Sequence, residues 1–330
     1  MGQGEETKTR EEPTIQIQER GEIFFFYRPK VGKEEAHGAE DVQRLYLVLR
    51  PESGFEEKQD DHYGKEGVSK RSASEDEEDD DGAKEGGGAG CQKVDIVEKQ
   101  PLLRLIVMGR KSLPQPAKKS TPYWGFVEMV TTQIQHLKAA LQGEEYETRT
   151  RGHRHLPDSR AVGEGVYRIL RHTGKKGMHT HLIYKLKFPA EEKVRHGEED
   201  DESSSSPQEA LNIAQEASFI IQIKSPDQHK STAGRLRGLD NKRKAAFPAH
   251  LQGLFGHQRY HPADPPDFLN YEGCEFLLIS ASDDIEQELG LDLKTEHEEE
   301  YAQCSDLLET FGDDVASDVF TRPLFEATWA

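Results

Sequence analysis

The chain is poor in cysteine and in apolar residues, and it has no long hydrophobic run. Its three cysteines, Cys91, Cys274 and Cys304, lie far apart, which excludes a disulfide framework and a cysteine-based zinc site. No apolar stretch approaches the roughly 18 residues that a membrane helix needs, so no membrane insertion is predicted. The opening residues, MGQGEETKTREE, contain no apolar signal core. We therefore expect a cytoplasmic or nuclear protein that is not secreted.

The composition indicates that only part of the chain folds into a core. Of the 330 residues, 34% are hydrophobic and 32% are charged, and 43 basic against 62 acidic side chains give a net charge of −19. A chain that is folded throughout is usually less polar than this. Part of the sequence is therefore predicted to be disordered, with a core smaller than the length suggests.

The negative charge is concentrated in three blocks. Residues 55–90 carry −8, residues 190–202 carry −5 and residues 283–318 carry −13, so the rest of the chain carries +7. The first two blocks have too few apolar residues to offset the entropy of ordering them. We predict a disordered N-terminus over 1–19, and disordered acidic loops over 55–92 and 190–208. The last block belongs to a predicted acidic C-terminal helix and tail over 283–330.

Short apolar runs between these blocks predict a mainly β domain of the α+β class over residues 20–282. The runs are rich in aromatic and β-branched residues, too short for globular helices, and several end at a proline that cannot continue a ladder. We expect a single mixed or antiparallel sheet, or a barrel-like arrangement, because no strand–helix–strand alternation is present. The predicted strands are 22–29, 44–51, 102–114, 123–130, 166–172, 178–184 (continuing to 189), 218–226 and 274–280.

Two or three short helices accompany the predicted sheet. Ile134, Leu137 and Leu141 recur at helical spacing, with Thr132 as a possible cap and Gly143 as a stop. Residues 242–255 predict a bent helical pair interrupted at Pro248. Residues 283–291 begin with acids that suit a helix N-terminus.

The segment 146–184 concentrates basic side chains and histidines. Arginine forks can hold a phosphate or a carboxylate by two-point contact, and nearby lysines add positive charge. Interleaved tyrosines could stack on bases. The alternative is that these charges form ordinary solvated strand faces. The predicted anion-binding residues are Arg149, Arg151, Arg154, Arg160, Arg168, Arg171, Lys175 and Lys176.

Two His-x-His pairs in the same segment suggest a second kind of site. Residues two apart on a strand share a face, so His153 with His155, and His179 with His181, could each present two imidazoles. If the pairs converged, four nitrogens could hold a divalent metal ion such as zinc. Against this, the surrounding arginines disfavour a bound dication, and solvent-facing histidines are the alternative. No G-x-S-x-G, H-E-x-x-H or Walker signature indicates an enzyme.

The C-terminus differs from the other acidic blocks because it contains apolar anchors. Leucines, valines, phenylalanines and Trp329 are interspersed with acids from residue 304 onward. Such a mixture suits a segment that docks in the groove of a partner or on the chain's own basic core. A helical strap packed on the domain is an equal alternative.

Eight motifs together resemble a plant protein family that has bacterial-like relatives. They are RLIVMGRKSLP, YWGFVEMVT, YETRTRGHRH, AVGEGVYRI, HTHLIYKL, ASFIIQIKSP, FPAHLQGLF and PADPPDFLNYEGCEFLLI, and the resemblance covers most of residues 22–290. Members of that family are often catalogued as BTB/POZ-domain-like. This resemblance implies a dimerising adaptor, of the kind that serves ubiquitin ligation.

The function that these patterns favour is that of a non-enzymatic interaction protein. Its basic β core would bind an anionic partner, either RNA or an acidic protein segment, and its acidic tail would compete for that surface. One alternative is a metal-dependent hydrolase or phosphoesterase that uses the paired histidines. Another is a scaffold of the BTB/POZ-labelled family that binds no small ligand.

Overall fold

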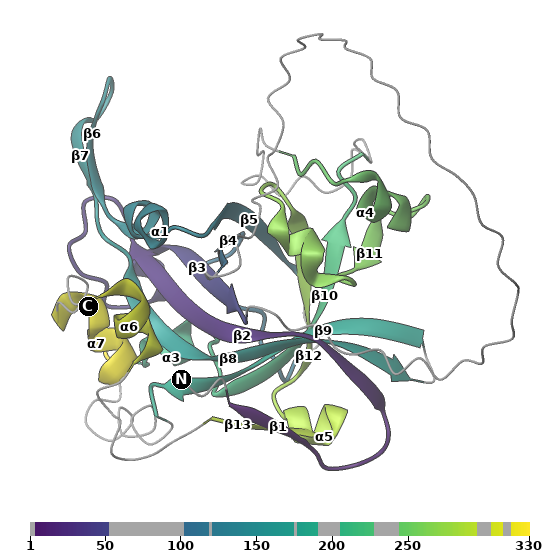
Figure 1. Cartoon of the computed structure of the whole chain (residues 1–330). Helices are drawn as coiled ribbons and strands as arrows, with labels where there is room; N and C mark the ends of the chain where they lie inside the picture. Colours follow the sequence, from purple (N-terminus) through teal and green to yellow (C-terminus); the bar gives the residue numbers. More distant parts are fainter. Residues whose placement is uncertain are drawn as a thin grey trace, which may run out of the picture.

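A computed structural model describes residues 4–52, 102–118, 121–174, 177–190, 205–227, 244–295, 305–312 and 318–330. Eight antiparallel strands pair in a closed ring, which gives the sheet a barrel-like shape (Figure 1). The pairing of β9 with β10 joins the two ends of the strand order. In order around the ring, the strands are β2 (Thr14–Pro29), β3 (Val42–Pro51), β4 (Leu103–Met108), β5 (Tyr123–Thr131), β12 (Glu275–Ser282), β10 (Glu216–Lys224), β9 (Gly177–Phe188) and β8 (Arg160–Gly174).

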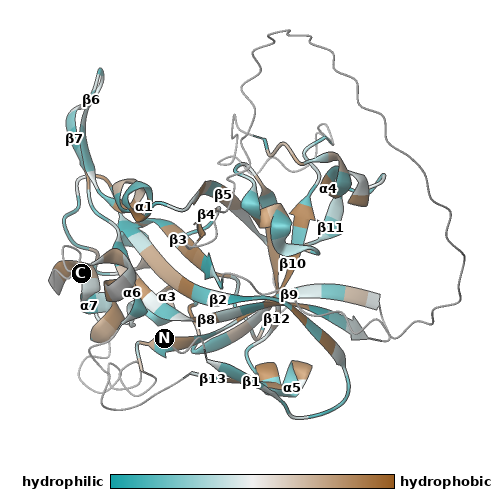
Figure 2. Ribbon diagram, viewed as in Figure 1, coloured by the Kyte–Doolittle hydropathy of each residue, from teal (hydrophilic) through white to brown (hydrophobic). Residues whose placement is uncertain are grey.

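The strand β2 shows why the ring has a core on both of its faces. Ile23, Phe25 and Tyr27 belong to the cluster inside the ring, whereas Phe24 and Phe26 belong to a second cluster outside it. All five are fully buried. Because successive side chains on a strand point to opposite faces, a run that is apolar at every position needs apolar cover on both sides. Figure 2 shows the resulting hydrophobic stretch along β2.

The interior of the ring is a packed core. The segment between β10 and β12 contributes to it through α4 (Ala249–Leu254) and the 3-10 helix η2 (Pro266–Asn270). The rings of Phe255 and Phe268 pack with their centroids 5.4 Å apart, and both side chains are at most 2% exposed. The short strand β11 (Tyr260–Pro262) pairs with the end of β10.

Helices cover the outside of the ring in two places. On one, α1 (Ile134–Leu141), α6 (Asp306–Phe311) and α7 (Asp318–Phe325) pack on the outward residues of β2, β3 and β4. On the other, α5 (Ile285–Leu289) and β13 (Leu291–Lys294) pack on Ile15, Ile17 and their neighbours. The N-terminal strand β1 (Glu5–Lys8) pairs with β13. None of the described helices is long and apolar enough to cross a membrane.

A two-stranded ribbon extends away from the ring. It consists of β6 (Glu144–Thr148) and β7 (Gly152–Leu156), which pair only with each other, and Figure 1 shows it projecting beyond the other elements. We call residues 144–156 the arm. The remaining short elements are η1 (Ala39–Asp41) and α3 (Pro207–Ala210), where Ser206 accepts a hydrogen bond from the Glu209 N–H as a helix cap.

The predicted fold class is confirmed. The chain is mainly β, with an antiparallel barrel-like sheet, short helices, and every predicted strand represented in the ring. The described residues contain six short α-helices instead of two or three. The extra helices are α3, α6 and α7, which are short and depend on caps and packing that periodicity does not reveal.

Several predicted boundaries are wrong. The N-terminus was expected to be disordered over 1–19, but β1 and the start of β2 lie there, because Ile15 and Ile17 are buried beneath α5 and β13. The predicted helical pair over 242–255 is a single helix, α4, that begins after Pro248. The end of the predicted loop 190–208 is ordered as the start of α3. Residues 55–92 and 191–204 lie outside the described residues.

A glycine in β8 tests the packing of the ring. A Cβ atom on Gly165 would clash with the backbone oxygen of Lys185 and approach the Leu186 Cα to 2.8 Å. Because backbone cannot yield as a side-chain tip can, we expect Gly165→Ala to lower the free energy of unfolding by about 2 kcal/mol. Gly253→Ala is the control, since nothing lies within 4 Å of its Cβ position, and it should be neutral or stabilising. Equal urea midpoints for the two variants would contradict the register of β8 against β9.

Candidate functional site

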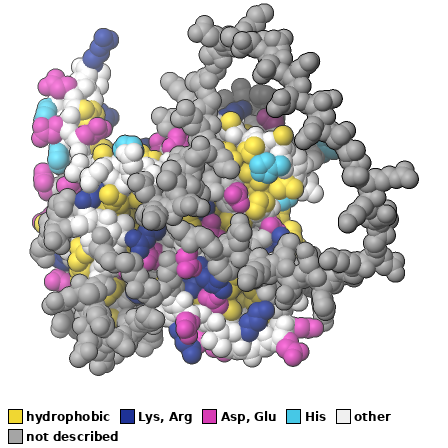
Figure 3. Space-filling view, in the orientation of Figure 1, with side chains coloured by type: hydrophobic (Ala, Val, Ile, Leu, Met, Phe, Trp, Pro, Cys, Tyr) yellow, Lys and Arg dark blue, Asp and Glu magenta, His cyan; other side chains and the backbone are white. Residues whose placement is uncertain are grey.

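The arm carries the exposed members of the predicted anion-binding set. Arg149 and Arg151 lie exposed in the turn between β6 and β7, and Arg154 is half-buried on β7. None of the three side chains makes an ion pair or hydrogen bond with another described residue. Figure 3 shows basic side chains at the tip of the arm, with acidic and histidine side chains along its length.

The register of the arm separates its side chains onto two faces. Glu145 pairs with His155 and Glu147 with His153 on one face, whereas Tyr146 pairs with Arg154 on the other. Diagonally across the two strands, His153 Nε2 lies 3.6 Å from Glu145 Oε2, with both side chains at least 60% exposed. Such exposed pairs are weak, so the side chains remain free to meet a partner.

The turn of the arm is held by its own backbone contacts. The Thr148 hydroxyl donates to the Gly152 carbonyl at 3.2 Å and accepts from the Arg151 N–H at 3.1 Å. Gly152 has a φ of +64°, which glycine adopts without strain. Neither edge of the ribbon pairs with another described strand, although the Gly32 N–H donates to the His155 carbonyl at 2.8 Å, and an isolated two-stranded ribbon is only marginally stable in water. The arm is therefore built like an element that gains stability from a partner.

The other arginines of the predicted set are occupied inside the molecule. Arg160 is buried and donates to the carbonyls of Asp158 and Glu34. Arg168 is fully buried and donates to the Glu6 carboxylate and the Gly4 carbonyl, both at 2.9 Å. These two side chains stabilise the fold and face no solvent.

Arg171 of β8, whose side chain is 37% exposed, forms a two-point ion pair. Its Nε and NH2 groups donate to the two carboxylate oxygens of Asp264 at 2.6 and 2.8 Å, and Gln18 donates to the same carboxylate at 2.6 Å. Burial raises the pKa of Asp264, but the hydrogen bonds from Arg171 and Gln18 outweigh it and leave the pKa below its usual range. Lys175 and Lys176, the last members of the predicted set, lie outside the described residues.

The sequence analysis did not predict an ion pair between Arg104 and Glu19 in the interior. The Arg104 guanidinium donates to both oxygens of Glu19 at 2.7 Å, and the Tyr167 hydroxyl donates to the same carboxylate at 2.7 Å. Arg104 also donates to Asn270 at 2.9 Å and is only 2% exposed. An arginine within an apolar strand was the available signal, but nothing local indicates its partner, which lies 85 residues away.

The two predicted histidine pairs are not brought together. His153 and His155 lie on the arm, whereas His179 and His181 lie on β9, in a different sheet, beside His172 of β8. Across β8 and β9, His172 Nδ1 lies 3.4 Å from His181 Nε2. Among the described residues, no group of three or more histidine, cysteine or acidic side chains is placed to hold a metal ion.

His181 is a buried neutral histidine. It is 2% exposed, and its Nδ1 lies 2.9 Å from the Ser218 hydroxyl. Burial lowers the pKa of His181 to about 3, with a smaller contribution from His172 and His179. The nearest carboxylate oxygen, on Glu288, is 3.9 Å away.

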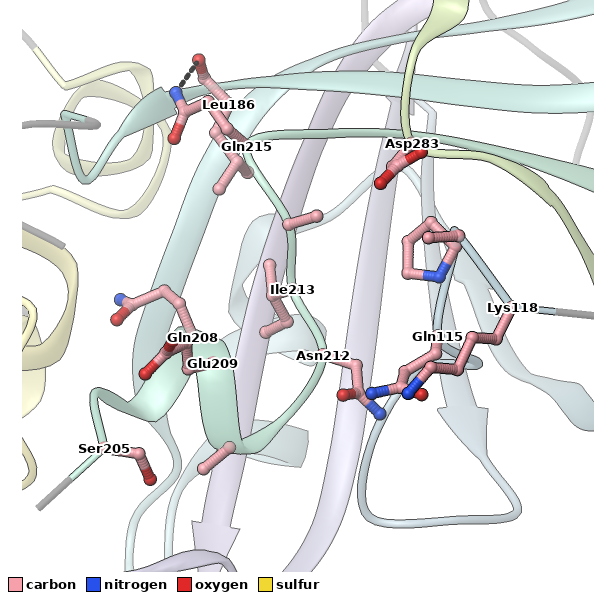
Figure 4. A pocket seen from close by; sticks show the side chains of 14 residues that line it. Gln115, Lys118, Leu186, Ser205, Gln208, Glu209, Asn212, Ile213, Gln215 and Asp283 are labelled. Carbon is pink, nitrogen blue, oxygen red and sulfur yellow. Dashed lines mark hydrogen bonds between the residues drawn. The ribbon is translucent and has the colours of Figure 1, made fainter. Parts of the chain in front are cut away.

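A surface cleft of about 640 Å³ lies beside α3 and the loop that follows it (Figure 4). Four side-chain amides are among the residues that line it, and three of them donate to backbone carbonyls. Gln215 donates to Leu186 at 3.2 Å, Asn212 donates to Leu113 at 2.9 Å, and Gln208 donates to Val162 at 2.8 Å. These amides fasten the loop to the ring and do not converge on a ligand position.

Cys274, directly before β12, is a core thiol. It is fully buried in the inner cluster, and burial raises the pKa of the thiol well above its ordinary value. A thiol held in its protonated form is a poor nucleophile. The described residues thus offer no activated cysteine.

Comparison of the chain with protein-family models, with curated proteins and with solved structures finds no match. Function is therefore inferred from the geometry and charge of the described residues.

The interior ion pair predicts a large stability effect. Arg104→Met would leave the Glu19 carboxylate without its guanidinium, so we expect the free energy of unfolding to fall by about 3–5 kcal/mol. The double variant Glu19→Gln with Arg104→Met should recover part of that stability, because it removes the uncompensated charge. Arg149→Met is the control in the same urea titration and should stay within about 0.5 kcal/mol of the original chain. A small effect of Arg104→Met would contradict burial of the pair.

His181 predicts a loss of stability in mild acid. Its folded pKa of about 3 lies below the ordinary value of 6.5, so the unfolded chain binds the extra proton first as the pH falls. The free energy of unfolding should therefore decrease by up to about 1.4 kcal/mol per pH unit below pH 6.5 from this group. His181→Asn keeps a polar atom near Ser218 and should have a flatter pH dependence. Parallel pH curves for the two chains would rule out a neutral buried imidazole.

Proposed function

We propose that the chain is a non-enzymatic interaction protein whose arm binds single-stranded RNA. The observation that supports this most is the position of Arg149, Arg151 and Arg154 on a projecting ribbon, without a described partner. The proposal moves the predicted anion surface from the β core to the arm. Within the core, Arg160, Arg168 and the other described arginines of the set already have partners.

The chemistry of the arm favours RNA over an acidic peptide. Arginine side chains can hold phosphate oxygens by two-point contact. Tyr146, which is 37% exposed, and the partly exposed rings of His153 and His155 can stack on unpaired bases. A single strand of RNA presents both phosphates and base faces, whereas an acidic peptide would use only the arginines.

The acidic C-terminal block supports modulation of that binding. Residues 283–318 carry −13, and described acids of this block lie on the ring. Repulsion between a polyanion and such acids fades beyond roughly one Debye length, about 8–10 Å at physiological salt, and reaches further at low salt. Removing the block outright would also remove α5 and β13, which bury part of the core, so neutralising exposed acids is the cleaner way to test it.

The arm can be tested directly with a labelled oligouridylate. We expect binding at low salt, with an affinity that falls steeply as salt rises. Arg149→Glu with Arg151→Glu should weaken binding by at least about tenfold. The slope of log affinity against log salt should also become shallower, by about 0.7 for each phosphate that the arm no longer neutralises. Fluorescence anisotropy over a salt series measures both quantities.

A charge-matched control separates the arm from the net charge of the chain. Lys118 and Lys244 are exposed and lie outside the arm, so Lys118→Glu with Lys244→Glu makes the same change in total charge. This control should keep most of the affinity of the original chain. Equally weakened binding in both double variants, no binding at low salt, or binding of poly-glutamate without binding of RNA would each overturn the proposal.

A further inference from the structure

The C-terminal strap, residues 305–312 and 318–330, adds no strand to the ring: its helices α6 and α7 pack on the outer face, whereas Trp329 packs against the inner cluster. None of its described residues forms a strand of the ring, so the eight strands keep their ladder hydrogen bonds whether or not the strap is bound. It is attached by apolar side chains and by a few directional polar contacts. The strap can therefore leave the ring without opening the sheet.

The apolar anchors of the strap sit on two phenylalanines of β2. Leu307 and Phe311 are one helical turn apart on α6 and are at most 1% exposed. The Phe311 ring lies 6.1 Å from the ring of Phe24 and 5.6 Å from that of Phe26, centroid to centroid. Phe320 of α7 packs 6.0 Å from the same Phe26 ring. The outer face of β2 is thus an apolar surface on which aromatic and aliphatic side chains pack.

A buried carboxylate of β8 receives the beginning of α6. Glu164 is 0% exposed and accepts hydrogen bonds from the Asp306 N–H at 2.9 Å, the Leu307 N–H at 3.2 Å and the Ser305 hydroxyl. Those N–H groups have no carbonyl partner within the helix, and the Leu307 N–H is shared between Glu164 and the capping Ser305 hydroxyl, so the contact satisfies both sides. The ring thus supplies a carboxylate that accepts hydrogen bonds from the free N–H groups at the start of a helix.

The edge of this surface carries basic as well as acidic side chains. Lys187 Nζ lies 2.6 Å from the Asp306 carboxylate, and the Arg50 guanidinium donates to the Thr310 hydroxyl. Arg50 also pairs with Glu22 of β2. Because Glu22 compensates Arg50, it is Lys187 that pairs with an acid at the start of the bound helix, as it does with Asp306 of α6.

The far end of the strap makes a second, independent attachment. The Trp329 ring packs edge-on against Tyr27 with centroids 5.4 Å apart, and its indole N–H donates to the Ser205 carbonyl at 2.9 Å. The Tyr27 hydroxyl donates to the Ala330 carbonyl at 2.7 Å. Because this contact is separate from Glu164, α6 can exchange while the end of the strap stays in place.

We propose that the outer face of β2, β3 and β8, with Glu164 and Lys187 at its edge, is a groove that binds an acidic amphipathic helix of a partner protein in place of α6. The partner helix begins with a serine or threonine followed by an acid, which serve Glu164 and Lys187. It carries two apolar anchors one turn apart for Phe24 and Phe26. This is recognition of a helix in a groove, and the strap is the built-in competitor.

The tethered strap lowers the apparent affinity of the intact chain for any such helix. A segment joined to its groove by a short linker competes at an effective concentration of the order of millimolar. Severing the tether removes this advantage. A partner helix therefore binds more tightly once the strap is no longer covalently attached.

The pH dependence of the exchange follows from Glu164. Under the strap, burial raises its pKa from 4.5 to about 7, although the Ser305 hydrogen bond opposes the shift. When the helix leaves, the pKa of the Glu164 carboxyl returns toward its ordinary value. Between about pH 4.5 and 7, Glu164 is therefore protonated more often in the occupied groove than in the empty one. Occupancy is then favoured below about pH 4.5 and weakens as the pH rises through 7. The charged groups around Glu164 are Asp306 from α6, Lys187 from β9, and the Glu22–Arg50 pair.

The experiment uses the full chain with a protease site placed within residues 296–304, which lie outside the described residues. A fluorescent peptide with the sequence 303–330 serves as the probe in anisotropy measurements. We expect it to bind the cleaved chain at least about tenfold more tightly than the uncleaved chain. Phe311→Ala in the peptide should weaken binding at least about tenfold, because it removes a buried aromatic anchor.

Val319→Ala in the peptide is the matched control, since Val319 is 39% exposed, and its affinity should stay within about twofold of the unmodified peptide. Glu164→Gln in the ring should flatten the pH dependence of binding between about pH 5 and 8. The proposed groove would be contradicted if the peptide failed to bind the cleaved chain. It would also be contradicted if Phe311→Ala and Val319→Ala in the peptide weakened binding equally. If the uncleaved chain formed a concentration-dependent dimer that Phe311→Ala abolished, the groove would bind a second copy of the chain. That result would contradict binding of a partner protein. All of these outcomes are independent of RNA binding by the arm.

Discussion

Closure of the eight-stranded sheet, completed by the pairing of β9 with β10, is the constraint on which the rest of the structure depends. A closed ring leaves no strand edge and buries one face of every strand. In β2 and β3 the outward face is apolar as well, so it requires cover. The helices α1, α6 and α7 supply that cover on one part of the outer face, and α5 with β13 supplies it on another.

The same closure determines what happens to the positive charge of the chain. The described arginines of the predicted set that lie on ring strands, Arg160, Arg168 and Arg171, are buried or partly buried, where an unpaired charge is costly. Each such arginine of the predicted set therefore has an internal partner. A basic stretch of sequence thus folds into a neutralised interior, and the arm, which lies outside the ring, retains its exposed arginines. The interior and covered ion pairs are Arg104 with Glu19, Arg168 with Glu6, and Arg171 with Asp264.

Local patterns were enough to predict the sheet but not the partners of its charges. Short runs rich in aromatic and β-branched residues predicted eight strands, and each of them forms part of the ring. Asp264 lies 93 residues from Arg171, and Glu6 lies 162 residues from Arg168, so no local pattern links either pair. The histidine pairs failed to converge for a related reason, because spacing along a strand does not indicate which sheet the strand joins.

The C-terminal segment was also predicted in part, because its composition is a local property whereas its contacts with the ring are long-range. Its apolar anchors were recognisable from composition, and docking on the ring was one of two open alternatives. The choice between them depends on Glu164, a buried acid in a strand that nothing in the sequence singles out. Its acceptor atoms explain why a helix begins at Ser305 and where it is held.

The central claim is that the arm, and not the ring, meets an anionic partner. Hydrogen exchange of the backbone amides with and without oligouridylate at low salt tests it most directly, because it reports on every segment at once. The account predicts slower exchange in residues 144–156 when RNA is added, with the ring strands unchanged. Protection of ring strands without protection of the arm would contradict it.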